Sequence, residues 1–243
     1  MTGSPVTSLH TRLARAARPA LTWYGDGGER VELSGPVLAQ WVTKASNLLV
    51  EELDAGPGYR VLLDLPGHWR AVVWALAVWR VGACVVVPDE AGAAPGEDAV
   101  LTASPSSFPG RHGVVAVALP ALARSFPEPL ADGVLDGATV LSYGDALGYV
   151  PVADPGAPAL AGPSGAVTYA GLVRPGADAG RVLLDATATP LDGLLRAVLD
   201  VLAADGSVVL VGGGYAEQLR ADDERRARLV ASEHVTASAP TAG

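Results

Sequence analysis

The chain has 243 residues, 49% of them hydrophobic, which is enough length and apolar content to bury one large core or two small ones. Its formal net charge of -9 argues against nucleic-acid and anionic-membrane partners, because either would need a basic face. The single cysteine, Cys84, excludes an internal disulfide framework and a cluster of thiolate metal ligands.

The start of the chain predicts a helix, a hairpin and a second helix, in that order. Residues 1–18 form the leading helix behind a flexible start, and strand-like segments 21–24 and 30–33 flank the turn Gly25-Asp26-Gly27-Gly28. Ser34 is a candidate N-cap for an amphipathic helix that ends before Gly56-Pro57-Gly58. No segment has the features of a signal peptide or the roughly 20 apolar residues of a membrane span, so we expect a cytoplasmic protein.

Residues 59–89 predict a βαβ unit, on which the α/β fold class rests. Two apolar strand runs, 60–65 and 84–87, flank a helical segment of about 14 residues that follows Pro66-Gly67. Strands that are apolar throughout indicate burial on both faces, and a helical crossover indicates a parallel pair. Trp69, Trp74 and Trp79 are five residues apart, so we expect one or two of them in the core and one on a contact surface.

The rest of the chain predicts short strands, two helices and a poorly defined middle. Strands are expected at 99–102 and 113–118, with an irregular connector at 104–110, and residues 119–163 show weak periodicity with many prolines and glycines. Further strands at 166–169, 181–184, 207–211 and 235–238 accompany helices at 191–202 and 217–232. We divide the chain into a leading segment (1–18), a first α/β subdomain (19–160) and a second one (161–243).

The order of these elements carries a family resemblance. Three segments are similar to stretches of the adenylate-forming (AMP-binding) superfamily. The opening strand pair of that superfamily resembles Pro19-Ala20-Leu21-Thr22-Trp23, and its "G-V-x-x-G-D-R-V" stretch resembles Gly56-Pro57-Gly58-Tyr59-Arg60-Val61. Its "K-A-G-A" stretch resembles Trp79-Arg80-Val81-Gly82-Ala83. That superfamily includes acyl-CoA synthetases, luciferases and peptide-synthetase adenylation domains. The resemblance implies layered sheets with flanking helices, as in a partial, truncated N-terminal domain of such an enzyme.

The residues that handle ATP in that family are largely missing here. Where its members have a phosphate loop of the type T-S-G-T-T-G-x-P-K, only Ser164-Gly165 is recognisable as a vestigial nucleotide-binding site. Pro163 removes one backbone donor, and the only lysine, Lys44, is predicted on a solvated helix face. Asp192 matches the position where amino-acid-activating members bind the substrate ammonium, although an acid there can also serve as a helix cap.

Two other patterns carry little chemistry. Gly212-Gly213-Gly214 follows a strand and precedes a helix, but it lacks the G-x-G-x-x-G spacing and is typical of a flexible turn. The four histidines are scattered, without a pair at metal-ligand spacing, so the sequence predicts no metal site.

Three hypotheses of function follow. The first is a shortened, non-catalytic relative of adenylate-forming enzymes without a cofactor, a binding or interaction module in which self-association or a protein partner covers surface exposed by truncation. The alternative is an AMP-forming carboxylate ligase, acyl-CoA synthetase-like, that uses ATP and Mg and needs a second chain or a divergent site. A third, weaker alternative is a dinucleotide-binding oxidoreductase that uses residues 212–214.

Overall fold

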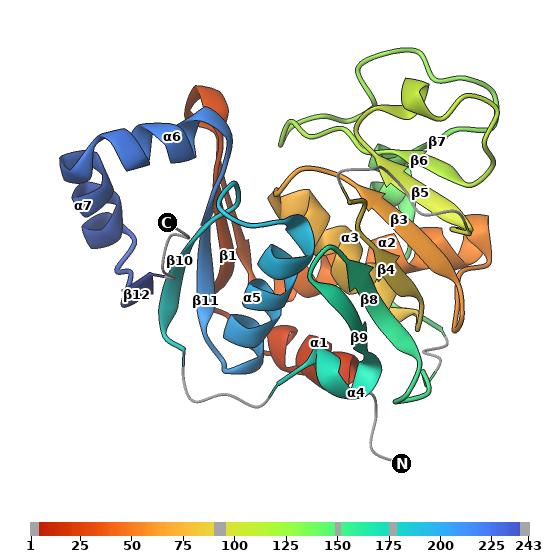
Figure 1. The fold of residues 1–243 in the computed structure, drawn as a ribbon, viewed down its shortest axis with the longest axis horizontal. Helices are drawn as coiled ribbons and strands as arrows, with labels where there is room; N and C mark the ends of the chain where they lie inside the picture. The colour runs from red at the N-terminus through yellow and green to blue at the C-terminus, as the bar shows by residue number, and fades with distance from the viewer. Residues whose placement is uncertain (1–4, 90–95, 149–151, 175–178, 239–243) are drawn as a thin grey trace.

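Two β-sheets enclose a layer of helices in the computed structural model, which describes residues 5–89, 96–148, 152–174 and 179–238 (Figure 1). The five-stranded sheet, sheet A, has the order β12-β10-β11-β1-β2, and the seven-stranded sheet, sheet B, has the order β7-β6-β5-β3-β4-β8-β9. Helices α3 and α5 touch strands of both sheets and therefore lie between them. The predicted α/β class with layered sheets is confirmed.

Sheet A joins the two ends of the chain. Its strands are β1 (Pro19–Tyr24), β2 (Arg30–Ser34), β10 (Arg181–Asp185), β11 (Ser207–Val211) and β12 (Ala237–Ser238). β1 pairs in parallel with β11, and it pairs antiparallel with β2 through the turn that holds the 3-10 segment η1 (Asp26–Gly28). The predicted hairpin is therefore confirmed, and its first strand lies inside a parallel sheet.

Sheet B holds the βαβ unit and most of the middle of the chain. Its strands are β3 (Arg60–Asp64), β4 (Cys84–Val86), β5 (Ala99–Thr102), β6 (Val114–Ala116), β7 (Leu135–Asp136), β8 (Pro158–Gly162) and β9 (Gly165–Thr168). β3 pairs in parallel with β4 on one side and with β5 on the other, and the β8–β9 hairpin closes one edge. The predicted parallel pair is confirmed, whereas β7 and β8 lie in the segment that sequence periodicity did not resolve.

The helices cover three faces of the sheets. They are α1 (Pro5–Leu13), α2 (Gly35–Leu53), α3 (Trp69–Arg80), α4 (Tyr169–Leu172), α5 (Leu191–Ala203), α6 (Gly213–Ala221) and α7 (Asp223–Ser232), with 3-10 segments η2 (Pro105–Ser107) and η3 (Gly137–Ser142). Ser34 caps α2 as predicted, since its Oγ accepts from the N–H of Val37 at 3.4 Å. Figure 1 shows α6 and α7 on the outer face of sheet A, away from α5.

α3 differs from the prediction for its tryptophans. Every residue from Trp69 to Trp79 is buried, because the helix packs on a sheet on either side and on α2 as well. Trp69, Trp74 and Trp79 are between 2% and 3% exposed, so none of them marks a contact surface.

One other prediction requires correction. The charged segment expected as one helix over 217–232 is broken at Asp222, whose Oδ1 accepts from the N–H of Arg225 at 2.8 Å and so begins a new helix. The expected division into subdomains stays a prediction. Residue 160 lies inside β8, and β1, which carries β2 at its other side, pairs with the late strand β11 rather than with sheet B. Sheet A combines strands from the beginning and the end of the chain, and sheet B combines strands from the middle.

The carboxyl ends of parallel strands from the two sheets meet at one place. A Cβ on Gly67, which follows β3, would collide with the carbonyl of Ala186, which follows β10. A Cβ on Gly212, which follows β11, would collide with the ring of Trp23 in β1. Ligands of parallel sheets bind at carboxyl ends, so this junction and the strand ends beside it are where a site is expected.

Candidate functional site

The structure brings the predicted residues Ser164, Gly165 and Asp192 together at the β8–β9 turn. The backbone N–H of Ser164 donates to Oδ2 of Asp192 at 2.7 Å. Asp192 lies in the first turn of α5 and is 1% exposed. Gly165 has φ +108°, a conformation that favours glycine. The Asp192 side chain therefore holds the β8–β9 turn against the first turn of α5.

This arrangement leaves the turn with one free donor fewer for a phosphate. A phosphate-binding turn offers free backbone N–H groups, but here the Ser164 N–H is bound by a carboxylate of the same chain. A Cβ on Gly162 would lie 2.8 Å from Oδ2 of Asp192, which shows how closely the acid packs against the turn. Oδ1 of Asp192 is buried and has no hydrogen-bond partner among the described residues. A phosphate brought to this turn would meet a buried like charge.

The start of α6 shows the same arrangement at the predicted glycine turn. Gly213 has φ +57°, and a Cβ there would lie 2.5 Å from Oδ2 of Asp26. Oδ1 of Asp26 accepts from the N–H of Tyr215 at 3.2 Å. The N-terminus of this helix thus already binds an anion from the β1–β2 turn. The dinucleotide alternative, which needs this position for a pyrophosphate, stays a prediction, and one backbone donor that it would use is bound by Asp26.

Lys44 is not on a solvated face, as the sequence suggested. Its Nζ donates to the carbonyl of Leu141 at 3.3 Å and to that of Tyr143, and it forms a 2.9 Å ion pair with Asp145. Its side chain is 16% exposed. The lysine therefore fixes the segment after η3 against α2.

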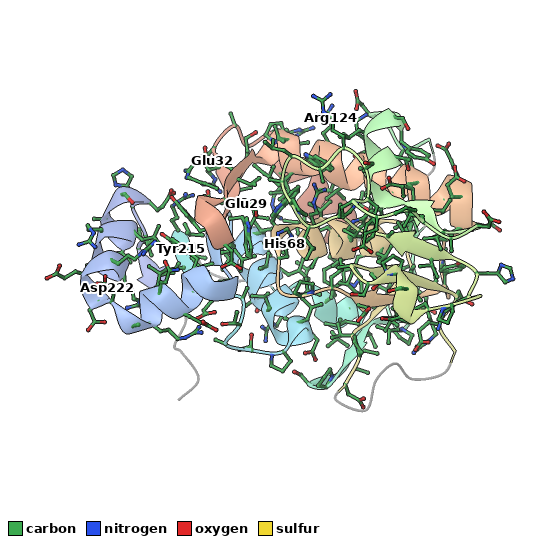
Figure 2. The ribbon with its side chains drawn as sticks, turned by 90° about the horizontal axis from the view of Figure 1, so that it is seen from above. Glu29, Glu32, His68, Arg124, Tyr215 and Asp222 are labelled. Carbon is green, nitrogen blue, oxygen red and sulfur yellow. The ribbon has the colours of Figure 1, made fainter. Side chains whose placement is uncertain are left out.

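A polar cluster that the sequence did not reveal lies where the two sheets meet. Oε2 of Glu29 accepts from the Trp23 indole N–H at 2.8 Å, and its Oε1 accepts from the backbone N–H of Ala121 at 2.8 Å. Nε2 of His68 lies 3.9 Å from Oε2 of Glu29, and Figure 2 shows these two residues side by side. Glu29 therefore links the turn after β1 to the segment that follows β6.

His68 and Arg70 complete this cluster from α3. Nδ1 of His68 accepts from the N–H of Arg70 at 3.2 Å, as an N-cap does. Burial lowers the pKa of His68 to about 4 and that of Arg70 to about 10, with Glu29 opposing both shifts. The Arg70 guanidinium donates to the carbonyls of Leu119, Pro120 and Ala121 at 3.1 to 3.4 Å. The only sequence signal for this cluster was that a polar residue, His68, follows a predicted strand and Pro66-Gly67.

Two adjoining cavities open beside this cluster, outside the carboxyl ends of β5 and β6. The first, of about 360 Å³, is lined by residues in segments 103–106, 117–120 and 126–128. The second, of about 350 Å³, is lined by residues in segments 105–112 and 126–134. Both include Pro105, Ser106, Phe126 and Glu128, and we call the combined space the Phe126 pocket. Small-molecule sites commonly have volumes in this range.

Comparison with known proteins decides the family. A protein of Mycobacterium tuberculosis described as a TIGR03089 family protein is 34% identical to this chain over 232 residues, which is 90% of each chain. The chain belongs to the TIGR03089 family. No family model matches the chain.

Solved structures similar to this family member are adenylate-forming enzymes. The Brucella canis acyl-CoA synthetase superimposes with a TM-score of 0.75 at 19% identity, over 98% of this chain and 47% of that one. The N-terminal subdomain of Klebsiella oxytoca NpsA, in complex with 3-hydroxybenzoyl-AMSN, gives a TM-score of 0.63 at 16% identity, over 98% and 60%. The amide bond synthetase McbA of Marinactinospora thermotolerans gives a TM-score of 0.64 at 18% identity, over 96% of this chain and 48% of that one.

These likenesses establish the fold of the family member. It is the fold of the N-terminal part of adenylate-forming enzymes, as the sequence resemblance implied, and the chain spans between 47% and 60% of the three solved proteins. Among the described residues, no group of three His, Cys, Asp or Glu side chains is placed to hold a metal ion. In that part of the chain, no helix has the length and apolar character of a membrane span.

Proposed function

We propose that this chain is a non-catalytic binding module that keeps the scaffold of the adenylate-forming enzymes without their use of ATP. The observation that carries the proposal is the bond between the Ser164 N–H and the Asp192 carboxylate. It places a buried negative group at the turn where the resemblance implies phosphate binding. Electrostatic stabilisation of the reacting phosphate is a large catalytic term, and a carboxylate opposes it.

Two further observations support a binding role over an adenylating one. The lysine that could offset phosphate charge, Lys44, is bound to Asp145 and to backbone carbonyls of the same segment. The Phe126 pocket, in contrast, is an open space with mixed apolar and polar walls that the chain itself does not fill. Association with a protein partner or a second copy, which we expected from the sequence, stays a prediction.

Calorimetric titration with ATP and Mg²⁺, alone and with a panel of carboxylic acids, tests the proposal. We expect no saturable heat of binding and no release of pyrophosphate. An Asp192→Asn variant keeps an oxygen that accepts from Ser164 and removes the charge, so a gain of weak ATP binding in this variant would identify the charge as the cause of exclusion.

The opposite result supports the ligase alternative. The likeness to an acyl-CoA synthetase and an amide bond synthetase favours that alternative, in which a second chain completes the site. Saturable binding of ATP to the unmodified chain, or pyrophosphate release with any acid of the panel, would overturn the proposal of a non-catalytic module.

A further inference from the structure

We propose that the Phe126 pocket binds a small planar aromatic molecule that carries no negative charge. This inference rests on the proposed binding role, because it names the class of ligand for the module. It is argued from the position of the pocket, the rigidity of its walls, the nature of its lining and the charge of its rim.

The position of the pocket is where open parallel sheets bind ligands. Sheet B reverses its strand order at β3, because the next strand, β4, pairs on one side and β5 pairs on the other. At this reversal the Thr102 hydroxyl donates to Oδ2 of Asp64 at 2.6 Å, which joins the ends of β5 and β3. The pocket begins at the next residue, Ala103, outside the carboxyl end of β5.

The wall nearest the sheet junction is held by two charged side chains. Arg70 donates to the carbonyls of residues 119–121, and Glu29 accepts from the N–H of Ala121. This segment has no helix or strand of its own, so these bonds replace the hydrogen bonds of regular structure. Two charged residues are thus used to fix a loop that forms one side of the pocket.

The remaining walls are fixed by prolines and by a carboxylate. Oδ2 of Asp136 accepts from the N–H of Phe126 at 2.9 Å, and the Thr102 Oγ1 accepts from the N–H of Ser104 at 2.9 Å. Five lining residues are prolines, whose fixed φ removes freedom that a ligand would otherwise have to restrict: Pro105, Pro109, Pro120, Pro127 and Pro129. A preformed pocket binds more tightly than one that must be ordered by its ligand.

The lining favours a planar aromatic ligand. The chain has two phenylalanines, Phe108 and Phe126, and both line the pocket. Phe108 packs against the outer apolar cluster of sheet B, and both rings remain partly exposed. Flat apolar rings and proline faces at a partly open site offer stacking surface, which aromatic molecules use best.

The charges at the rim disfavour an anion. Glu128 and Asp132 line the pocket and are exposed. The arginine of the lining, Arg111, donates to the carbonyl of Glu97 at 2.9 Å and lies 3.5 Å from its carboxylate. The positive charge is therefore offset within the chain, and the two acids leave the rim negative. A carboxylate ligand of the kind that an acid ligase takes would be repelled here.

The test compares benzamide with benzoate, which have the same shape and differ in charge. Saturation-transfer NMR on the full chain measures both affinities, and amide chemical shifts of the labelled chain map the site. We expect saturable benzamide binding that shifts resonances of residues 103–134, at least fivefold tighter than benzoate binding. Glu128→Lys, an exposed change, should reverse or abolish that preference.

Variants of the lining complete the test. Phe126→Ala should weaken benzamide binding about tenfold through lost stacking. Its control is Leu122→Ala, because Leu122 is 93% exposed, lies nearby in sequence and lines neither cavity. Phe126→Leu, which keeps apolar volume, replaces the alanine variant if that one does not fold.

Several results would overturn the inference. They are benzamide shifts that map outside residues 103–134, no saturable binding, equal or tighter binding of benzoate, or no effect of Glu128→Lys on the preference. If the chain bound ATP, the proposal of a non-catalytic module would be overturned and the pocket proposal would stand. If neither benzamide nor ATP bound, only the pocket proposal would be overturned.

Discussion

Two aspartates, Asp192 and Asp26, accept from backbone N–H groups of glycine-containing turns, the first in a β-hairpin and the second at the beginning of a helix. Asp192 accepts from Ser164 at the β8–β9 turn, and Asp26 accepts from Tyr215 at the start of α6. Both positions suit an anion, because helix N-termini and strained turns present unpaired N–H groups. In this chain the anion is a side chain in each case. In each turn, one backbone donor that an anionic ligand could use is therefore bound within the chain.

The burial of His68 predicts a loss of stability in mild acid. Its pKa is lowered from 6.5 to about 4, so between these values the unfolded chain binds a proton that the folded chain does not. Stability is then fully present above pH 6.5 and falls as the pH falls towards 4. At pH 5 the expected loss from His68 is about 2 kcal/mol of unfolding free energy, measured by urea denaturation at pH 7 and pH 5.

The control for this prediction is His68→Asn, which keeps an acceptor for the Arg70 N–H and does not titrate. Its stability should change less between pH 7 and pH 5 than that of the parent chain. Some dependence should remain, because burial also lowers the pKa of His10 to about 4. An equal pH dependence in the variant and the parent chain would show that His68 does not remain neutral in the fold.

At the scale of the elements, local patterns were sufficient for most strands and helices. The βαβ unit was predicted because apolar runs and glycine stops are local signals, and β3, α3 and β4 agree with it. The complete burial of α3 was not predicted. It depends on a second sheet, formed when β1 pairs with β11 from the other end of the chain. No local sequence pattern predicts the pairing of β1 with β11.

The site shows the same limit. The family resemblance directed attention to Ser164 and Asp192, and the structure places them in contact. Their roles in nucleotide and substrate binding stay predictions. The Glu29 cluster was missed because it joins β1, α3 and the segment after β6, three segments that are separate in sequence. The Phe126 pocket was missed because prolines and side-chain bonds, rather than periodic structure, shape it.

The break between α6 and α7 gives a prediction at the same scale. Asp222→Ala removes the side chain that caps α7, so the unfolding free energy should fall by about 1 kcal/mol in urea denaturation. Asp223→Ala is the matched control, because Asp223 is an exposed acid of the first turn and contributes a few tenths of a kcal/mol at most. Equal effects of the two changes would contradict the assignment of Asp222 as the cap.

At the scale of the whole molecule, Glu29 connects the two sheets at the edge where the pocket opens. It accepts from Trp23 on sheet A and from Ala121 beside the carboxyl end of β6. Glu29→Ala leaves both donors without this partner, and the expected cost is about 2 kcal/mol of unfolding free energy. Glu32→Ala is the control on the same hairpin, because its ion pair with Arg30 is exposed and contributes little (Figure 2).

The same change connects the fold to the proposed pocket. Without Glu29 the segment 119–121 keeps its bonds to Arg70 and loses the bond to its own N–H, so hydrogen exchange at Ala121 should become faster. A ligand must then order the wall it binds, and benzamide affinity should fall several-fold although Glu29 lines neither cavity. Unchanged affinity in a folded Glu29→Ala chain would show that the wall does not depend on the junction between the sheets.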